Sequence, residues 1–222
     1  MQASSTATRA VRFLCSEYSA DKLAILDVGC GRGDHLAHFG PGSLGLDAVA
    51  TNIDAVRARG LEAELANVED GLPKLDRRWD AAYCSNIVEH LVAPHLLLLR
   101  LHEVLTPNGL VFIMVPTVPP ARPLDWLIRR IIGHNGYRAA EHIYAFTPRT
   151  AEFMVERAGY RVIETAFVAA RGARLLRPLE PIFKEIGISA LVVARRDPLF
   201  VYPEKRVRQF TPSYVGQLDQ RN

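Results

Sequence analysis

Hydrophobic positions near the start of the chain recur at the spacing of a helix. Ala7, Val11, Leu14 and Tyr18 follow one another at steps of four, three and four residues, which places them on one face of a helix. The pattern predicts an amphipathic helix over residues 4–19. We therefore expect residues 1–22 to form an N-terminal helix that packs on the core of the protein.

Beyond residue 22, short apolar runs alternate with segments of helical composition. The runs are "LAILDV", "SLGLDA", "LEAELA", "DAAYCS" and "GLVFIMV", and the segments between them include "NIDAVRARG" and "PHLLLLRLHEVL". Further on, "TPRTAEFMVERAG" predicts a capped helix that ends at Gly159, followed by the strand candidates "YRVIETAFV" and "ISALVVAR". This alternation predicts an α/β fold, a parallel sheet with helices on both faces.

Two stretches interrupt the alternation. Residues 117–141 are rich in proline and contain an apolar group, and a second irregular stretch covers residues 171–187. We expect one domain over residues 23–196, with insertions at about 117–141 and 171–187 that form a pocket and its lid, and a polar extension over residues 197–222. Trp126 and paired arginines within residues 124–132 suit peripheral membrane contact, and a pocket cover or a dimer contact is the alternative.

Composition narrows the class of protein. With 49% hydrophobic and 23% charged residues, the chain resembles average soluble globular proteins. Cys15, Cys30 and Cys84 are odd in number and lack metal-ligand spacing, so they indicate neither a disulfide framework nor a zinc site. A formal charge of +3 is too small to predict a nucleic-acid partner. The chain lacks an apolar run of roughly 18 residues and a signal-peptide pattern, so we expect a cytoplasmic protein.

The stretch "ILDVGCGRG", residues 25–33, carries the most specific chemistry. Its glycines follow a G-x-G-x-G spacing directly after a predicted strand. A phosphate-binding P-loop needs Lys and Ser or Thr after the last glycine, whereas Asp34 and His35 follow Gly33. A dinucleotide site uses G-x-G-x-x-G, and the carboxylate of Asp27, two residues before Gly29, would repel a pyrophosphate. The same carboxylate suits a ligand that carries an ammonium group.

With the residues that follow it, this stretch resembles the class I S-adenosylmethionine-dependent methyltransferases, particularly the branch that acts on small molecules and lipids. The resemblance covers about residues 23–168. It implies a Rossmann-like, seven-stranded, mostly parallel sheet with an antiparallel last strand, S-adenosylmethionine as cofactor, S-adenosylhomocysteine as product and no metal. The residues that it assigns to the cofactor are Asp27, Gly29, Cys30, Gly31, Gly33, Asp47, Ala48, Asn67, Val68 and, beside the methionine moiety, Ser85 and Asn86.

The resemblance also implies individual roles. Asp27 helps hold the amino group of the cofactor, often through water, and Asp47 accepts bonds from both ribose hydroxyls. Asn67 and Val68 fall where the family binds adenine. The family more often has Asp at the position of Asn67, but an amide oxygen can also accept a hydrogen bond. Two alternatives stay open, because Asp47 also suits a helix cap and Asn67 also suits a turn.

Methyl transfer from a sulfonium depends chiefly on alignment of the reactants. For an alcohol or carbon-acid acceptor a general base becomes useful, and His90 and His142 are the candidates, with a packing or hydrogen-bonding role as the alternative for each. His134 and Tyr137 are weaker candidates.

The chain has no N-P-P-Y-like run after the fourth predicted strand and no basic stripe interleaved with aromatic residues. We therefore expect a methyltransferase for a small-molecule or a lipid- or glycan-linked acceptor, not for nucleic acid. The alternatives are a catalytically silent S-adenosylmethionine-binding or interaction protein with the same fold and, third, an NAD-dependent oxidoreductase, which the glycine spacing and Asp27 disfavour.

Overall fold

The computed structural model describes residues 5–118, 142–167 and 189–200, and it contains a seven-stranded sheet in the order β3-β2-β1-β4-β5-β7-β6. The strands are β1 (Ile25–Val28), β2 (Leu44–Asp47), β3 (Ala63–Leu65), β4 (Trp79–Ser85), β5 (Leu105–Pro116), β6 (Tyr160–Ala166) and β7 (Ser189–Arg196). The helices are α1 (Ser5–Tyr18), α2 (Ala50–Ala58), α3 (Pro94–Val104) and α5 (Pro148–Arg157), with the 3-10 turns η1 (Ala20–Lys22) and η2 (Leu36–His38).

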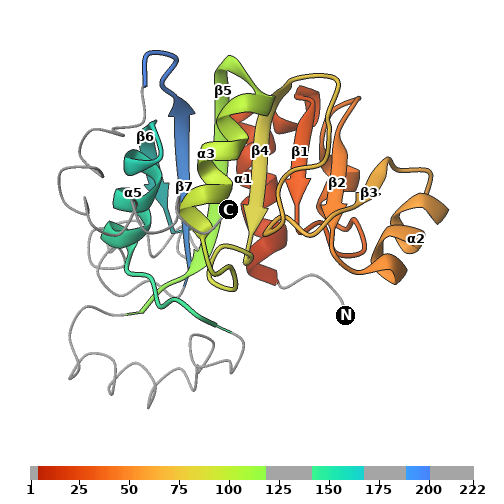
Figure 1. The fold of residues 1–222 in the computed structure, drawn as a ribbon, viewed down its shortest axis with the longest axis horizontal. Coiled ribbons are helices and arrows are strands. Elements are labelled where there is room, and N and C mark those ends of the chain that lie inside the picture. Colours follow the sequence, from red (N-terminus) through yellow and green to blue (C-terminus); the bar gives the residue numbers. More distant parts are fainter. Residues whose placement is uncertain (1–4, 119–141, 168–188, 201–222) are drawn as a thin grey trace, which may run out of the picture.

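Strands β1 to β5 pair in parallel, whereas β7 is antiparallel to both of its neighbours, β5 and β6. The arrow of β7 accordingly runs against that of β4 (Figure 1). The predicted α/β fold, with a mostly parallel sheet and an antiparallel last strand, is confirmed.

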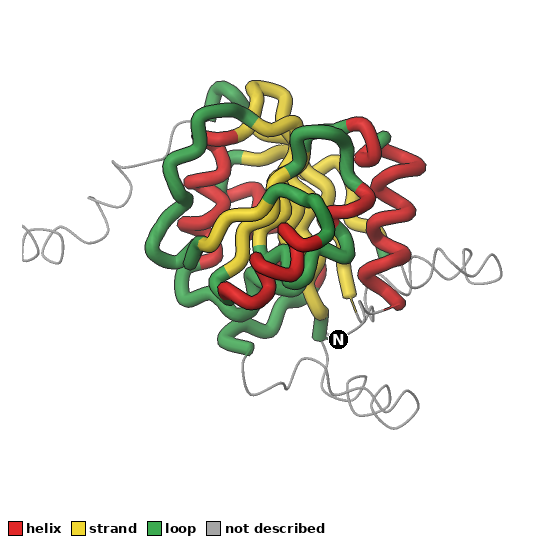
Figure 2. The backbone as a smooth tube through the Cα atoms, turned by 90° about the vertical axis from the view of Figure 1, so that its right-hand side faces the viewer, coloured by secondary structure: helices red, strands yellow, loops and turns green. Residues whose placement is uncertain are grey.

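Helices cover both faces of the sheet (Figure 2). All four residues of β1 are buried because successive side chains point to opposite covered faces. Ile25 packs in the cluster that contains residues of α1, whereas Leu26 and Val28 pack in the cluster that contains residues of α3 and α5. The two faces of the sheet therefore bury separate parts of the core.

The N-terminal helix forms where the apolar spacing predicted it. Val11 and Leu14 are buried in the same cluster as Tyr83 and Phe112 of the central strands. The ring of Tyr18 meets Phe112 edge-on at 5.7 Å between centroids. The side chain of Ala7 lies outside the described part of the chain.

One boundary differs from the sequence pattern. Helix α3 ends at Val104, and β5 begins at Leu105 instead of continuing the helix through that residue. Leu105 is buried and pairs with Trp79, after which the register of the two strands shifts and pairing resumes at Leu110 with Ala81. By its apolar character alone, Leu105 fits the end of helix α3 as well as the start of strand β5. Its pairing with Trp79 places it in the strand.

Helix α5 has the predicted caps. The Thr147 hydroxyl accepts a hydrogen bond from the backbone N–H of Thr150 at 3.1 Å, and the Thr150 hydroxyl accepts one from the N–H of Thr147 at 2.9 Å. Gly159 follows the helix with φ of 87°, a conformation that glycine adopts without strain.

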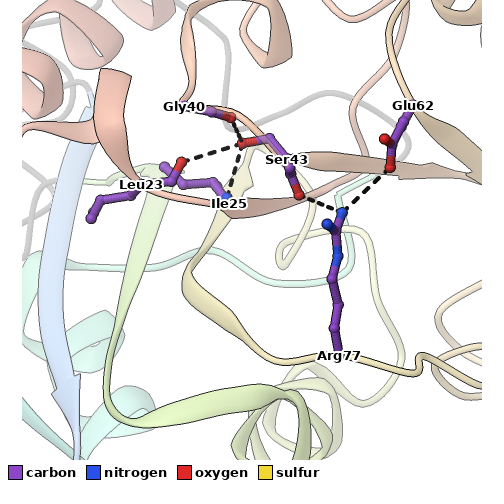
Figure 3. Close-up of polar contacts among 7 residues, drawn as sticks. Leu23, Ile25, Gly40, Ser43, Glu62 and Arg77 are labelled. Atoms are coloured by element: carbon purple, nitrogen blue, oxygen red, sulfur yellow. Dashed lines mark hydrogen bonds and ion pairs between the residues drawn. The ribbon is translucent and has the colours of Figure 1, made fainter.

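Polar contacts also fix the amino ends of β1 and β2 (Figure 3). The Ser43 hydroxyl accepts a bond from the N–H of Ile25 at 2.9 Å and donates to the carbonyl of Gly40 at 2.7 Å. Arg77 reaches the same turn and lies 3.4 Å from the Glu62 carboxylate. These contacts anchor the edge of the sheet opposite to the glycine turn.

Several predicted features lie outside the described residues: most of the first insertion with residues 124–132, His134 and Tyr137, the second insertion at 171–187, and residues 201–222. The described ends of these segments pack on the domain. Thr117 pairs with Phe146, and the N–H of Asp197 donates to the carbonyl of Gly159 at 2.9 Å. Within the described ranges, no helix is both long and apolar enough to pass through a bilayer.

Candidate functional site

The predicted cofactor residues gather at one edge of the sheet. Strands β1, β2 and β4 are neighbours in parallel register, with Val28 beside both Leu46 and Cys84. Because parallel strands all end at the same edge, the glycine turn after β1, Asp47 of β2 and Ser85 of β4 lie at the carboxyl edge, where ligands bind in sheets of this class.

The glycine turn needs glycine for two different reasons. Gly29, Gly31 and Gly33 have φ of 74°, 54° and 76°, in the left-handed region that other residues rarely adopt. A Cβ on Gly29 would approach Ile87 Cδ1 to 2.7 Å, whereas one on Gly31 would meet no atom within 4 Å. Gly29 therefore allows close packing, and Gly31 faces open space in which a ligand can lie.

Asp47 is tied to this turn. Its Oδ2 accepts a hydrogen bond from the N–H of Gly31 at 2.8 Å, and its Oδ1 accepts bonds from the N–H of Val49 at 2.9 Å and from the amide of Asn52 at 3.1 Å. The residue at the N-cap of α2 is Val49, without a side-chain cap bond, so the alternative of Asp47 as that cap is wrong. Each carboxylate oxygen has two acceptor sites, so these three bonds leave one site free, on Oδ2, and a second ribose hydroxyl would have to replace one of them, such as that from the Asn52 amide. Ala48, beside it, is exposed.

Asp27 is a buried acid that lacks a complete set of partners. Its side chain is 1% exposed, and within the described residues its Oδ2 has no hydrogen-bond partner. Burial raises the pKa of Asp27 to about 8, and the nearby charge of Asp47 adds to that increase. A cation beside this oxygen would compensate for the lost solvation. An ammonium-bearing ligand therefore fits the residues present.

The β3–β4 loop, residues 67–70, follows β3 at the same edge. The side chain of Asn67 accepts from the N–H of Glu69 at 3.2 Å and donates to Asp70 at 3.0 Å, so Asn67 closes a turn as its alternative role predicted. Val68 is buried, and the guanidinium of Arg100 donates to the carbonyls of Val68 and Glu69, each at 3.1 Å. Arg100, which sequence reasoning missed, holds this loop.

The chain leaves β4 through a sharp turn. Asn86 has φ of 51°, and its N–H donates to the carbonyl of Met114 at 2.8 Å. Asparagine is among the few residues that tolerate this left-handed conformation. The turn presents Ser85 and Asn86 at the rim of the sheet, with the Asn86 amide 3.4 Å from the Ser85 hydroxyl.

The two candidate bases meet in space. The rings of His90 and His142 are 4.7 Å apart between centroids and meet edge-on at 77°. They are brought together because the N–H groups of Ile143 and Tyr144 donate to the Glu89 carbonyl, at 2.9 Å and 3.1 Å. The His90 side chain is 34% exposed, so solvent and small molecules can reach it.

Glu89 is a second residue that sequence reasoning missed. It is 0% exposed, and neither carboxylate oxygen has a hydrogen-bond partner among the described residues. Its Oε1 lies 3.9 Å from His90 Nε2, and burial raises the pKa of Glu89 to about 7. The sequence does contain one signal for it: Glu89 stands between the apolar residues Val88 and Leu91, which are buried themselves. An acid in such a position indicates a buried carboxyl group.

Ligand atoms of Glu89, His90 and His142 lie within 4.8 Å of one another, and in the described part of the chain these three groups form the candidate set for a metal ion. The expectation of a metal-free protein stays a prediction. Cys30 and Cys84 are buried, as expected of packing residues, and burial raises the pKa of the Cys30 thiol to about 12. Neither cysteine has the properties of a nucleophile.

Comparison with known proteins identifies the family. A family model described as a methyltransferase domain matches residues 2–165. The chain belongs to this methyltransferase family.

Solved structures show the same fold. An S-adenosylmethionine-dependent methyltransferase from Mesorhizobium loti superposes with a TM-score of 0.62 at 20% identity, covering 86% of this chain and 98% of that one. A 1,6-didemethyltoxoflavin-N1-methyltransferase from Burkholderia thailandensis, solved with S-adenosylhomocysteine, has a TM-score of 0.59 at 19% identity, covering 86% of this chain and 78% of that one. This methyltransferase therefore has the class I fold.

Among curated relatives, a ubiquinone biosynthesis O-methyltransferase from Chelativorans sp. (strain BNC1) is 33% identical over 135 residues, which cover 57% of this chain and 49% of the relative. The chain thus spans about half the length of that relative.

Proposed function

We propose that this methyltransferase transfers a methyl group from S-adenosylmethionine to a small-molecule or a lipid- or glycan-linked acceptor. One observation carries the proposal: the orphaned Oδ2 of buried Asp27 lies at the same edge as Asp47 and the open space at Gly31. An acceptor for a cation, an acceptor for a diol and bare backbone together suit a nucleoside with an ammonium group. The cofactor-bound relative of the same fold is consistent with this assignment.

In this proposal each predicted residue keeps its role. Asp27 holds the amino group of the cofactor, and Asp47 accepts bonds from its ribose. Gly29, Cys30, Gly31 and Gly33 bring the backbone under the cofactor, and Ala48 flanks the ribose. Asn67 and Val68 bind adenine, while Ser85 and Asn86 line the methionine portion. The cofactor supplies an electrophilic methyl group, and the protein aligns it with the acceptor, a contribution of about 7–11 kcal/mol in favourable cases.

We favour a hydroxyl acceptor, because His90 and His142 converge beside the rim and the curated relative is an O-methyltransferase. One of these histidines takes the hydroxyl proton as the new C–O bond forms and the C–S bond breaks. Since the sulfonium leaves as a neutral thioether, we expect transfer without a metal ion. The cytoplasmic location and membrane contact through residues 124–132 remain predictions of the same proposal.

Titration calorimetry with S-adenosylmethionine, S-adenosylhomocysteine and NAD tests the cofactor assignment. We expect both methyl-cycle ligands to bind, NAD not to bind, and Asp47→Ala to weaken binding by about tenfold or more, since it removes acceptors for two hydroxyls. Asp54→Ala removes an exposed acid from the neighbouring helix α2 and is the matched control. Preference for NAD, or no binding by folded protein, would contradict the proposal.

Turnover separates an enzyme from the alternative, a silent cofactor-binding protein. We expect S-adenosylhomocysteine to accumulate when hydroxylated aromatic and lipid-linked acceptors are supplied, and to do so after treatment with a chelator. Loss of turnover on chelation, with recovery on adding a divalent cation, would contradict the metal-free expectation and implicate Glu89, His90 and His142.

A further inference from the structure

Three residues with buried polar side-chain atoms are neighbours on the α1 face of the sheet. The atoms are Asp27 Oδ2, Tyr83 Oη and His35 Nε2, and none of them has a hydrogen bond of regular geometry within the residues that the structure describes. The Ser85 side chain does interact with the Tyr83 hydroxyl and offsets part of the rise in its pKa that burial causes. Asp27 and Tyr83 are directly opposed in the parallel register of β1 and β4, so their side chains project from the same face. The His35 ring meets the Tyr83 ring edge-on, with 5.6 Å between centroids and 88° between planes.

Packing explains where the Tyr83 ring lies but not why it carries a hydroxyl. Phe39 meets the ring edge-on at 5.3 Å, and His35 contacts it as well, so its position is fixed by aromatic neighbours. Phenylalanine would make the same aromatic contacts without burying a hydroxyl, which here interacts with the Ser85 side chain of the same strand. Buried polar groups in folded proteins nearly always have partners, and several orphaned groups at a ligand-binding edge indicate a ligand that supplies them.

The three atoms offer a specific chemical complement. The Asp27 carboxylate accepts hydrogen bonds, the Tyr83 hydroxyl donates or accepts them, and the imidazole of His35 donates from Nε2 in one neutral tautomer. Burial lowers the pKa of His35, which favours the neutral ring. An α-amino acid group carries an ammonium donor and a carboxylate acceptor on one carbon, so it matches a set of one anion and two neutral donors.

We propose that Tyr83 and His35, together with Asp27, form the binding site for the amino-acid end of the cofactor. Asp27 receives the ammonium group, and Tyr83 and His35 donate to the carboxylate, directly or through one bound water. The inference rests on the proposed function, since it assumes that S-adenosylmethionine is the ligand. Tyr83 and His35 then act as cofactor-positioning residues that hold the sulfonium at a fixed place along the sheet edge.

A pair of ligands isolates this part of the site. S-Adenosylhomocysteine carries the amino-acid end, and 5′-methylthioadenosine keeps the nucleoside and sulfur but lacks it. In titration calorimetry, Tyr83→Phe and His35→Leu should each lower the affinity for S-adenosylhomocysteine by about tenfold. This is the usual effect of losing a hydrogen bond to a charged group. Both variants should bind 5′-methylthioadenosine within about twofold of wild type. The matched control, Phe39→Leu, removes an aromatic contact of Tyr83 without removing a polar atom.

Thermal unfolding of the ligand-free protein gives a second readout. Tyr83→Phe should unfold no earlier than wild type, because it removes a buried hydroxyl that lacks a hydrogen bond of regular geometry and keeps the ring. Equal losses for the two ligands, unchanged affinity for S-adenosylhomocysteine, or a lower unfolding temperature of Tyr83→Phe would each overturn the inference. Failure of the proposed function is distinguishable, because wild-type protein would then bind neither ligand.

Discussion

Asp27→Asn is the substitution whose effects can be worked out furthest from the structure. The change replaces a buried carboxyl group by a neutral amide of similar shape. The folded-state pKa of Asp27, about 8, lies above its usual value of 3.8, so between these pH values the folded protein binds a proton that the unfolded chain has released. Stability should therefore fall as the pH rises through this window and level off above it.

The size of the effect follows from the same shift. At about 1.36 kcal/mol per pH unit, the difference between 3.8 and about 8 corresponds to at most about 6 kcal/mol of lost stability. Asp27→Asn removes this titration. The ligand-free variant should unfold at a higher temperature than wild type at pH 8.5, and the difference should shrink at pH 5, where Asp27 is neutral in the folded protein.

Cofactor binding should show the opposite preference, because an ammonium group favours the ionised carboxylate. At pH 7 only about one folded molecule in ten carries ionised Asp27, given a pKa of about 8. Binding must then release a proton, and affinity should rise by up to about tenfold between pH 6 and 7. The amino group of the ligand titrates near pH 8, so the measurement belongs below pH 7.5.

Calorimetry of S-adenosylhomocysteine binding in two buffers of different ionisation enthalpy measures both quantities. We expect close to one proton released at pH 6.5 by wild type, and none, with weaker and pH-independent affinity, by Asp27→Asn. Proton uptake, or a wild-type affinity that does not change between pH 6 and 7, would refute the assignment of Asp27 as the ammonium partner.

Two further predictions separate fold from ligand binding. Gly31→Ala should cost about 1–2 kcal/mol of stability for its left-handed backbone and abolish most cofactor affinity, because its methyl group enters open space at the site. Gly29→Ala should lower stability further, because its Cβ would lie 2.7 Å from Ile87 Cδ1. Denaturant unfolding measures the stability of the two variants, and ligand titration measures their cofactor affinity. Identical unfolding curves for Gly29→Ala and Gly31→Ala would contradict the reasoning. Arg100→Ala should lower the affinity for S-adenosylhomocysteine by about fivefold, since it removes the hydrogen bonds from Arg100 to two carbonyls of the β3–β4 loop. Unchanged affinity would show that cofactor binding does not depend on these bonds.

Local patterns along the chain predict much of the fold. The apolar spacing of α1, the cap residues Thr147 and Gly159 and the short apolar strands each depend on residues close together in sequence. The glycine turn is equally local, because the positive φ angles of Gly29, Gly31 and Gly33 express a requirement of the backbone itself. Patterns of this kind predict elements and their order, and the alternation of elements predicts a parallel sheet.

Boundaries and partners depended on contacts that the pattern does not contain. Leu105 stands at the end of a helical pattern in the sequence, yet it belongs to β5 because it pairs with Trp79 of β4. Asn67 matched an adenine position by sequence, while its side chain closes a turn with Glu69 and Asp70.

The sequence by itself determined that a carboxylate and bare backbone would stand at the end of a buried strand, because residues 25–33 contain both. Only the tertiary structure decided that Asp27 Oδ2 would lack a partner, that the Tyr83 and His35 rings would meet, and that Glu89 would lie buried close to two histidines. The physical reason is that burial and pairing are properties of surroundings. Those surroundings come from strands and loops far apart along the chain, which become neighbours only when the sheet forms.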